Sequence, residues 1–261
     1  MIGQKELVNK FNSYTLETLP HTILLLGDKG CGKHTLVNEL SKRLDTPVVD
    51  ISDNINLDTI SNAMLSPFNY FYIINMNQLN ERQQNVILKF IEEPSDRTYI
   101  FLLCENKLSL LDTIINRCIS FVFKPYSKEE LSQFTNETDE RIFNYCKTPG
   151  QVKSTNIQKL DELDSLCDNI ITKMMKASVT NTLSVANRFN YKDNYDKFDI
   201  DVFFNLLMNK TLVYYRNNNV KAKELYFMVN DYYRKMKDSR MNKQHLMENM
   251  MLNIWEVMRN V

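Results

Sequence analysis

Glycine is scarce in this chain. Only five glycines occur among 261 residues, where average usage of about 7% would give roughly 18. Three of the five, Gly27, Gly30 and Gly32, fall within six consecutive positions. Because glycine lets the backbone adopt positive φ and approach a ligand closely, this cluster indicates a specialised loop.

An excess of charge and a long apolar run are also absent. Lys+Arg and Asp+Glu both number 32, so bulk charge does not drive binding to nucleic acid, and such a contact needs a local patch. No run of 18 apolar residues occurs, and the first residues lack the apolar segment of a secretory signal. The sequence therefore predicts a cytoplasmic protein that does not bind membranes.

Paired cysteines are missing as well. The five cysteines are odd in number and widely spaced, with no C-x-x-C motif: Cys31, Cys104, Cys118, Cys146 and Cys167. This pattern argues against a disulfide framework and against a zinc ribbon. We expect reduced thiols and no metal held by cysteine.

The first 123 residues alternate short apolar runs with helical patterns, which is typical of a parallel sheet flanked by helices. With 43% hydrophobic residues, the chain can form a sizeable core. Helical stripes follow the first and third runs, and an Asn80–Gln83 capping box starts the second helix, which Pro94 ends. The predicted strands are Thr22–Leu26, Pro47–Ile51, Tyr70–Ile74, Thr98–Leu103 and Ile119–Phe123.

After Phe123 the strand pattern disappears and the chain is predicted to be all helix. A helix is expected to start at 127–131 and another over 137–147, closed by Thr148-Pro149-Gly150. The fold class is thus α/β followed by all-α, with domains at 1–123, 124–160 and 161–261. Met-rich stripes in the last domain, such as Met247, Met250 and Met251, are interpreted as helix-bundle core, with an adaptable subunit interface as the alternative.

The glycine cluster has the form of a phosphate-binding loop. Gly27-Asp28-Lys29-Gly30-Cys31-Gly32-Lys33 follows an apolar run directly and opens a helix, the context that a P-loop requires. Backbone N–H groups would surround phosphate oxygens, and Lys33 would reach the β- and γ-phosphates. A chance glycine-rich turn is the alternative.

The elements that hold Mg²⁺ depart from this pattern. His34 stands where a P-loop carries Ser or Thr, and the hydroxyl of Thr35 comes one residue later; imidazole is a poor ligand for a hard cation. The strand that should end in carboxylates ends in Asn75 and Met76. Asp50 or Glu105 could compensate. The sequence predicts nucleotide binding with weak or no use of Mg²⁺.

Several segments carry known motifs: Ile2-Gly3-Gln4, NVILKFIEEP at 85–94, LLDTIINRC at 110–118 and TPGQ at 148–151. They resemble motifs of the AAA+ clamp-loader subunits, most closely the delta-prime subunits of bacterial DNA polymerase III. The resemblance implies an AAA+ P-loop domain, a small helical lid and a C-terminal helical collar. It covers about residues 1–155 with motifs and the remaining helices only by their character.

The resemblance also implies roles for single residues. Arg117 falls at the arginine-finger position, which would reach ATP held by a neighbouring subunit; a plain surface arginine is the alternative. Cys104 falls where a sensor residue would touch the γ-phosphate, Cys118 is expected to be a buried structural thiol, and Lys153 lies near a second sensor. The four zinc-binding cysteines of many bacterial members are absent, which suggests a reduced, phage or mobile-element version.

The leading hypothesis is a non-hydrolysing or weakly active clamp-loader subunit that binds ATP or ADP and assists its neighbour. Its expected partners are the other subunits of a hetero-oligomeric ring, a sliding clamp and primer-template DNA. An active motor subunit with an atypical metal site is the alternative, and a small-molecule kinase is a third. A basic stretch over 208–240 is either a solvated helix face or a DNA contact, and we favour the former.

Overall fold

The computed structural model describes residues 3–136, 139–174, 178, 199–216, 220–238 and 241–259. The chain forms two compact units. The first comprises Met1–Glu130 together with the three residues Thr148–Gly150, and the second comprises Leu131–Lys147 and Gln151–Val261.

The first unit contains a five-stranded parallel sheet with the order β2-β3-β4-β1-β5. All five predicted strands are confirmed, with ends that differ by no more than one residue. Their bounds are β1 Thr22–Leu26, β2 Val48–Asp50, β3 Tyr70–Asn75, β4 Thr98–Cys104 and β5 Ile119–Val122.

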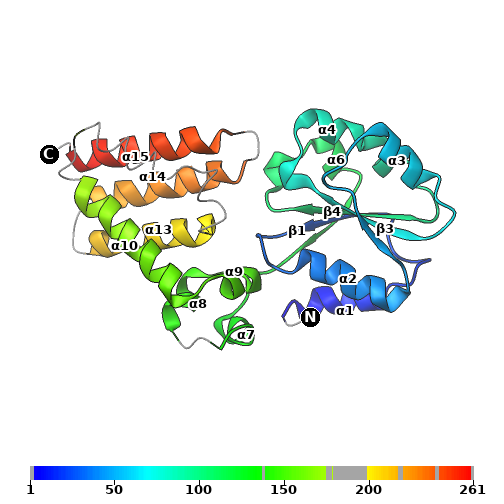
Figure 1. The fold of residues 1–261 in the computed structure, drawn as a ribbon, viewed down its shortest axis with the longest axis horizontal. Coiled ribbons are helices and arrows are strands. Elements are labelled where there is room, and N and C mark those ends of the chain that lie inside the picture. Colours follow the sequence, from blue (N-terminus) through cyan, green and yellow to red (C-terminus); the bar gives the residue numbers. More distant parts are fainter. Residues whose placement is uncertain are drawn as a thin grey trace. The chain divides into compact units, whose positions relative to one another are not determined.

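Alternation along the strands divides the apolar side chains between two cores. In β1, Ile23 and Leu25 pack on one face of the sheet, whereas Leu24 and Leu26 pack on the other. Helices cover both faces (Figure 1). The first face carries α1 (Lys5–Ser13) and α2 (Lys33–Leu44); the second carries α3 (Leu57–Met64), α4 (Glu81–Val86), α5 (Leu88–Glu92) and α6 (Asp112–Ile115).

Most helices of this unit follow the sequence pattern. The helix predicted between Asn80 and Pro94 is present as α4 and α5, which meet at Ile87, whose backbone stays helical (φ −81°, ψ −8°). The capping box is confirmed: Gln83 N donates to Asn80 Oδ1 at 3.0 Å and Asn80 N donates to Gln83 Oε1 at 3.1 Å. Helices α1 and α3 were not predicted.

Among its described residues, the regular secondary structure of the second unit is helical, as predicted. Leu225, Val229, Met247, Met250 and Met251 are buried, which confirms the helix-core interpretation for these positions. The helices are α8 (Glu140–Tyr145), α9 (Pro149–Ser154), whose first two residues belong to the first unit, α10 (Ile157–Met174), α13 (Ile200–Arg216), α14 (Val220–Met236) and α15 (Lys243–Arg259); α7 (Lys128–Ser132) precedes them.

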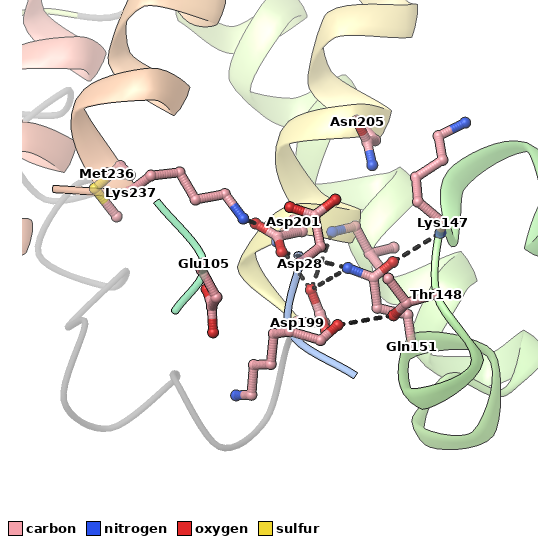
Figure 2. A network of polar contacts seen from close by, with 12 residues as sticks. Asp28, Glu105, Lys147, Thr148, Gln151, Asp199, Asp201, Asn205, Met236 and Lys237 are labelled. Carbon is pink, nitrogen blue, oxygen red and sulfur yellow. Dashed lines mark hydrogen bonds and ion pairs between the residues drawn. The ribbon is translucent and has the colours of Figure 1, made fainter. Parts of the chain in front are cut away.

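A buried carboxylate joins three helices of the second unit. Asp201, in the first turn of α13, is 4% exposed. Its Oδ1 lies 2.7 Å from Lys237 Nζ, and its Oδ2 accepts a hydrogen bond from Gln151 Nε2 at 3.4 Å (Figure 2). Because an unpaired buried charge is costly, this pair fixes the start of α13 against the end of α14.

Two boundaries differ from the sequence interpretation. Thr148-Pro149-Gly150 was expected to close a helix, but Pro149 is the first residue of α9, a position where its missing N–H costs nothing. The helix expected over 137–147 is α8, and residues 137 and 138 lie outside the described residues. Helix α10 runs through residues 160 and 161, so the division into lid and collar stays a prediction.

Helices of the described residues are too short or too polar to cross a bilayer.

The capping box gives a stability test. Replacing Asn80 with Ala removes the acceptor for the Gln83 N–H, so we expect Asn80→Ala to lower the free energy of unfolding by about 1 kcal/mol in urea titrations. Asn85→Ala, on the exposed side of the same helix, is the control and should be neutral or slightly stabilising. Equal losses in both variants would contradict the cap.

Candidate functional site

The glycine cluster connects the end of β1 to the start of α2. Strand β1 lies between β4 and β5 in the sheet, and Gly27 N donates to Cys104 O at 3.1 Å, which extends the β1–β4 ladder by one residue. The loop therefore begins at the edge of the sheet where the parallel strands end. Ligands of open α/β sheets bind at this edge.

Positive φ angles shape the loop. Gly30 has φ +79° and Gly32 has φ +101°, a region that side chains disfavour. Gly32 is the N-cap of α2, and no side chain caps this helix. The first N–H groups of a helix have no intrahelical acceptor, so they are oriented to receive an anion.

Five consecutive carbonyls of the loop accept hydrogen bonds from this chain. The donors come from the loop's own lysine and from two distant segments. Lys33 Nζ donates to Gly27 O and, at 3.0 Å, to Asp28 O; Thr148 Oγ1 donates to Lys29 O at 2.8 Å, Gly150 N to Gly30 O at 3.0 Å, and Tyr126 OH to Cys31 O at 2.7 Å.

These bonds determine where the amides point. In a trans peptide the C=O and the following N–H point in opposite directions. Holding the carbonyl of Lys29 therefore directs the Gly30 N–H the other way, and holding the carbonyl of Cys31 does the same for the Gly32 N–H. The N–H groups of Gly30 and Gly32 therefore point away from these satisfied carbonyls, which fits a phosphate group, whereas the N–H of Cys31 donates to Asp28 O at 3.2 Å.

Lys33 is built into this arrangement. Its side chain starts at the first residue of α2, and the residue is 7% exposed. The ammonium group lies among the loop carbonyls and 3.8 Å from Cys31 Sγ. A cation is thus held on the carbonyls of Gly27 and Asp28, and its contact with the β- and γ-phosphates stays a prediction.

The other glycines also lie at close contacts. A Cβ on Gly27 would come within 2.8 Å of Cys31 Sγ and of Phe123 Cβ. A Cβ on Gly3 would lie 2.7 Å from the ring of Tyr126. Burial raises the pKa of Tyr126 to about 12, so its hydroxyl keeps the proton that it donates to the loop.

Gly30 and Gly150 meet backbone to backbone. A Cβ on Gly30 would lie 2.8 Å from the Gly150 Cα, and one on Gly150 would lie 2.6 Å from the Gly30 Cα. Sequence analysis placed Gly150 in a family motif but gave no contact for it, because a pairing across 120 positions leaves no periodic signal. The scarcity of glycine elsewhere was the available indication.

The strand end that should carry carboxylates is neutral. Asn75 Oδ1 accepts from Asn77 N at 3.1 Å, which starts a short 3-10 turn. Met76 was predicted to stand at the phosphate edge; instead it is fully buried in the core beneath α3–α6, because the turn directs its side chain inward. His34 and Thr35 are both exposed on the first turn of α2.

The two acids proposed as substitutes are engaged nearby. Asp50 Oδ1 accepts from the N–H and the hydroxyl of Ser52. Glu105 Oε1 accepts from Asn77 Nδ2 at 3.2 Å, and Glu105 N donates to Asn77 Oδ1 at 2.8 Å. Across residues 3–136 and the other described ranges, no three His, Cys, Asp or Glu side chains are grouped as metal ligands.

Cys104 does not face the phosphate side. It is fully buried in the core beneath α3–α6, and its Sγ donates to Asn106 O at 3.2 Å. The sequence predicts a degraded sensor here, since a thiol is a poor hydrogen-bond donor, and alternation along β4 turns the side chain into the core. Cys118 is half-buried against the same core.

Arg117 lies at the end of the sheet where the parallel strands begin. It precedes β5 by two residues, and because all strands are parallel, the starts of the strands lie opposite the edge that carries the phosphate loop. Its guanidinium contacts Glu92 Oε1 at 2.8 Å and donates to Thr113 O at 2.7 Å, with 39% of the side chain exposed.

The basic stretch is largely neutralised where it is described. Lys210 contacts Asp164 and Asp168 at 2.9 and 2.8 Å, and Lys235 contacts Asp231 at 2.6 Å. Together with Lys237 on Asp201, these pairs neutralise three of the described lysines, and the preference for a solvated face over a DNA contact stays a prediction. The side chains of Arg216 and Lys221, and Arg240 as a whole, lie outside the described residues.

Lys153, which lies near the region of a second sensor in the family, has its Nζ 5.3 Å from the ring centroid of Phe134.

The cysteines give a second test. Burial raises the pKa of every thiol, to about 12 for Cys118 and about 11 for Cys146. A higher pKa lowers the thiolate fraction, so at pH 8 the native thiols should react with a disulfide reagent more slowly than a free thiol, by about two to three orders of magnitude for Cys146 and Cys118. The unfolded protein, as the control, should titrate five thiols at once. A fast native thiol would instead indicate an activated nucleophile.

The comparisons with known proteins agree with this geometry. The family model described as DNA polymerase III, delta subunit, matches residues 48–127. DNA polymerase III subunit delta' of Buchnera aphidicola subsp. Schizaphis graminum is 25% identical over 69% of this chain and 65% of its own length. The same subunit of Bacillus subtilis is 34% identical over 31% of this chain and 25% of its own length.

A solved structure was also matched at lower identity. A solved DNA polymerase III gamma subunit-related protein from Thermotoga maritima is 16% identical, covers 98% of this chain and 99% of its own, and has a TM-score of 0.48. The sequence alignments span less than two thirds of the delta' relatives. By its sequence matches the chain is similar to the delta-prime subunits of DNA polymerase III, and its parallel sheet and C-terminal helices have the fold class that the resemblance to AAA+ clamp-loader subunits implies.

Proposed function

We propose that this chain is a clamp-loader subunit that binds ATP or ADP with little or no hydrolysis and supplies Arg117 to the nucleotide of a neighbouring subunit. It would act in DNA replication, within a hetero-oligomeric ring that places a sliding clamp on primed DNA. The observation that carries this proposal is the separation of two features. The phosphate loop lies where the parallel strands end, and Arg117 lies where they begin.

The phosphate loop fits a polyphosphate. Its amides lie at an uncapped helix N-terminus, its carbonyls are already satisfied, and Lys33 supplies a positive charge. These groups would hold the phosphates of a nucleotide through backbone N–H groups and the Lys33 ammonium. Nothing in this arrangement requires a divalent cation to fix the loop.

The donors expected around a catalytic Mg²⁺ do not fit that ion. Asn75 offers a neutral amide that already accepts an N–H, Met76 is buried, and His34 replaces the hydroxyl. Hard divalent cations prefer carboxylate and hydroxyl oxygens. We therefore assign no step of hydrolysis to this subunit and place its contribution at Arg117.

Arg117 suits a role in trans. Its position at the far edge of the sheet keeps it from the loop of its own chain, and its side chain is partly exposed. An exposed ion pair such as that with Glu92 is worth about 0–1 kcal/mol, so a phosphate group can displace it. The alternative of an active motor subunit would require Asp50 or Glu105 to leave its present partner.

Nucleotide binding gives the first test of this proposal. The chain should bind ADP and ATP in calorimetry with affinities that differ less than about threefold with and without Mg²⁺, since the loop amides and Lys33 make the contacts. Lys33→Ala should weaken binding by about tenfold or more, because charge-assisted hydrogen bonds are lost. Lys42→Ala, in the last turn of α2, is the control. Mg²⁺-dependent turnover by the chain alone would support the motor alternative.

Arg117 gives the second test. In the ring that this chain forms with ATPase subunits, Arg117→Ala should lower ATP turnover by about 10³-fold, the lower range for arginine fingers. Arg82→Ala, an exposed arginine of α4, should leave turnover unchanged. Arg117→Ala should also leave nucleotide binding by this chain intact. Unaltered ring turnover would contradict the role in trans.

A further inference from the structure

The phosphate loop is held by three residues that lie far from it in the sequence. We propose that Thr148 and Gly150 are positioning residues of the candidate nucleotide site, acting as a clip on the carbonyls of Lys29 and Gly30. The inference rests on the proposed function in one respect: the loop is taken to bind phosphate. It assigns to the Thr148–Gly150 segment a role in nucleotide affinity without contact to the nucleotide.

The clip acts through two different kinds of donor. The Thr148 hydroxyl donates to Lys29 O at 2.8 Å, and the Gly150 N–H donates to Gly30 O at 3.0 Å. Thr148 is 2% exposed, so the hydroxyl is held by its surroundings. Adjacent carbonyls of the loop are thus fixed by one short segment.

Fixing these carbonyls prepares the loop for its ligand. The planar peptide that carries Lys29 O also carries the Gly30 N–H, which points the opposite way. A glycine peptide without such a restraint rotates freely, because Gly30 at φ +79° has no Cβ to limit it. The clip therefore removes freedom that phosphate binding would otherwise have to remove.

The backbone contact makes the clip intolerant of side chains. A Cβ at position 150 would lie 2.6 Å from the Gly30 Cα and 3.2 Å from the Gly30 O. Because the opposing atoms are backbone, they cannot rotate away, and the segment would have to move off the loop. Gly150→Ala should therefore release both hydrogen bonds together.

The experiment uses the full chain with ADP as the ligand. Thr148→Val keeps the shape of the side chain and removes its donor, and Thr148→Ser keeps the donor. Thr172→Val is a control on an exposed residue, since Thr172 Oγ1 also donates to a backbone carbonyl, that of Asp168 at 2.6 Å, within α10. The dissociation constant for ADP, the melting temperature and hydrogen exchange of the amides of residues 27–35 are measured for each.

We expect Thr148→Val to raise the dissociation constant about three- to tenfold, the value of one hydrogen bond, and to speed exchange of the loop amides. Thr148→Ser should restore both, and Thr172→Val should alter neither. Gly150→Ala should weaken binding more than Thr148→Val. Equal exchange and equal affinity in Thr148→Val and the unaltered chain would overturn the clip.

Failure of the clip and failure of the proposed function are distinguishable. If the unaltered chain binds no ADP or ATP, the proposed nucleotide site is wrong, whereas exchange of the loop amides still decides whether Thr148 holds the loop. If Thr148→Val and Thr172→Val lower the melting temperature equally and Thr148→Ser does not restore affinity, Thr148 is a general structural residue and the clip is rejected.

Discussion

The backbone contact between Gly30 and Gly150 is the constraint on which the phosphate loop depends. Neither residue can carry a Cβ at this distance, and the hydrogen bond from Gly150 N to Gly30 O would be lost if they separated. The same reasoning applies to Gly3 beside Tyr126, whose hydroxyl holds Cys31 O. In four of the five glycines a Cβ would come within 3 Å of another atom, and the fifth, Gly32, has a positive φ.

The two ends of the parallel strands carry different functional groups. At one edge the loop offers amides, a helix N-terminus and Lys33, while the neighbouring strand ends in the neutral Asn75. At the other edge Arg117 is held by Glu92 and by a main-chain oxygen. Parallel pairing of β1 and β5 produces this separation, because Arg117 lies just before β5 and the loop lies just after β1. The proposed nucleotide binding and the proposed contribution of Arg117 to a neighbouring subunit are therefore assigned to different surfaces of one domain.

Much of the first unit could be predicted because its signals are local. Strands with continuous apolar runs, the Asn80 capping box and the P-loop spacing each depend on residues close in sequence, and the structure has all of them. Helix α3 was missed because it is short, with few buried side chains. Met76 was misplaced because a one-residue difference in a turn decides which face a side chain takes.

The contacts that complete the site were not predictable from pattern. Tyr126, Thr148 and Gly150 reach the loop across 95 to 120 positions, and a hydroxyl or an N–H donated over that distance leaves no periodicity. The ion pair of Arg117 with Glu92 is of the same kind. Two motifs recognised separately turn out to touch each other, which gives a physical reason for their presence in one chain.

The first compact unit is not a continuous stretch of sequence. Its last three residues, Thr148–Gly150, are flanked on both sides by residues of the second unit. The donors for Lys29 O and Gly30 O therefore lie, in the sequence, between two segments of the helical second unit. Exchange of the first 130 residues between related proteins would separate the loop from these donors, so the two segments have to be inherited together. A chimaera joined at residue 130 therefore needs a compatible Thr-Pro-Gly segment from the protein that supplies its helical part.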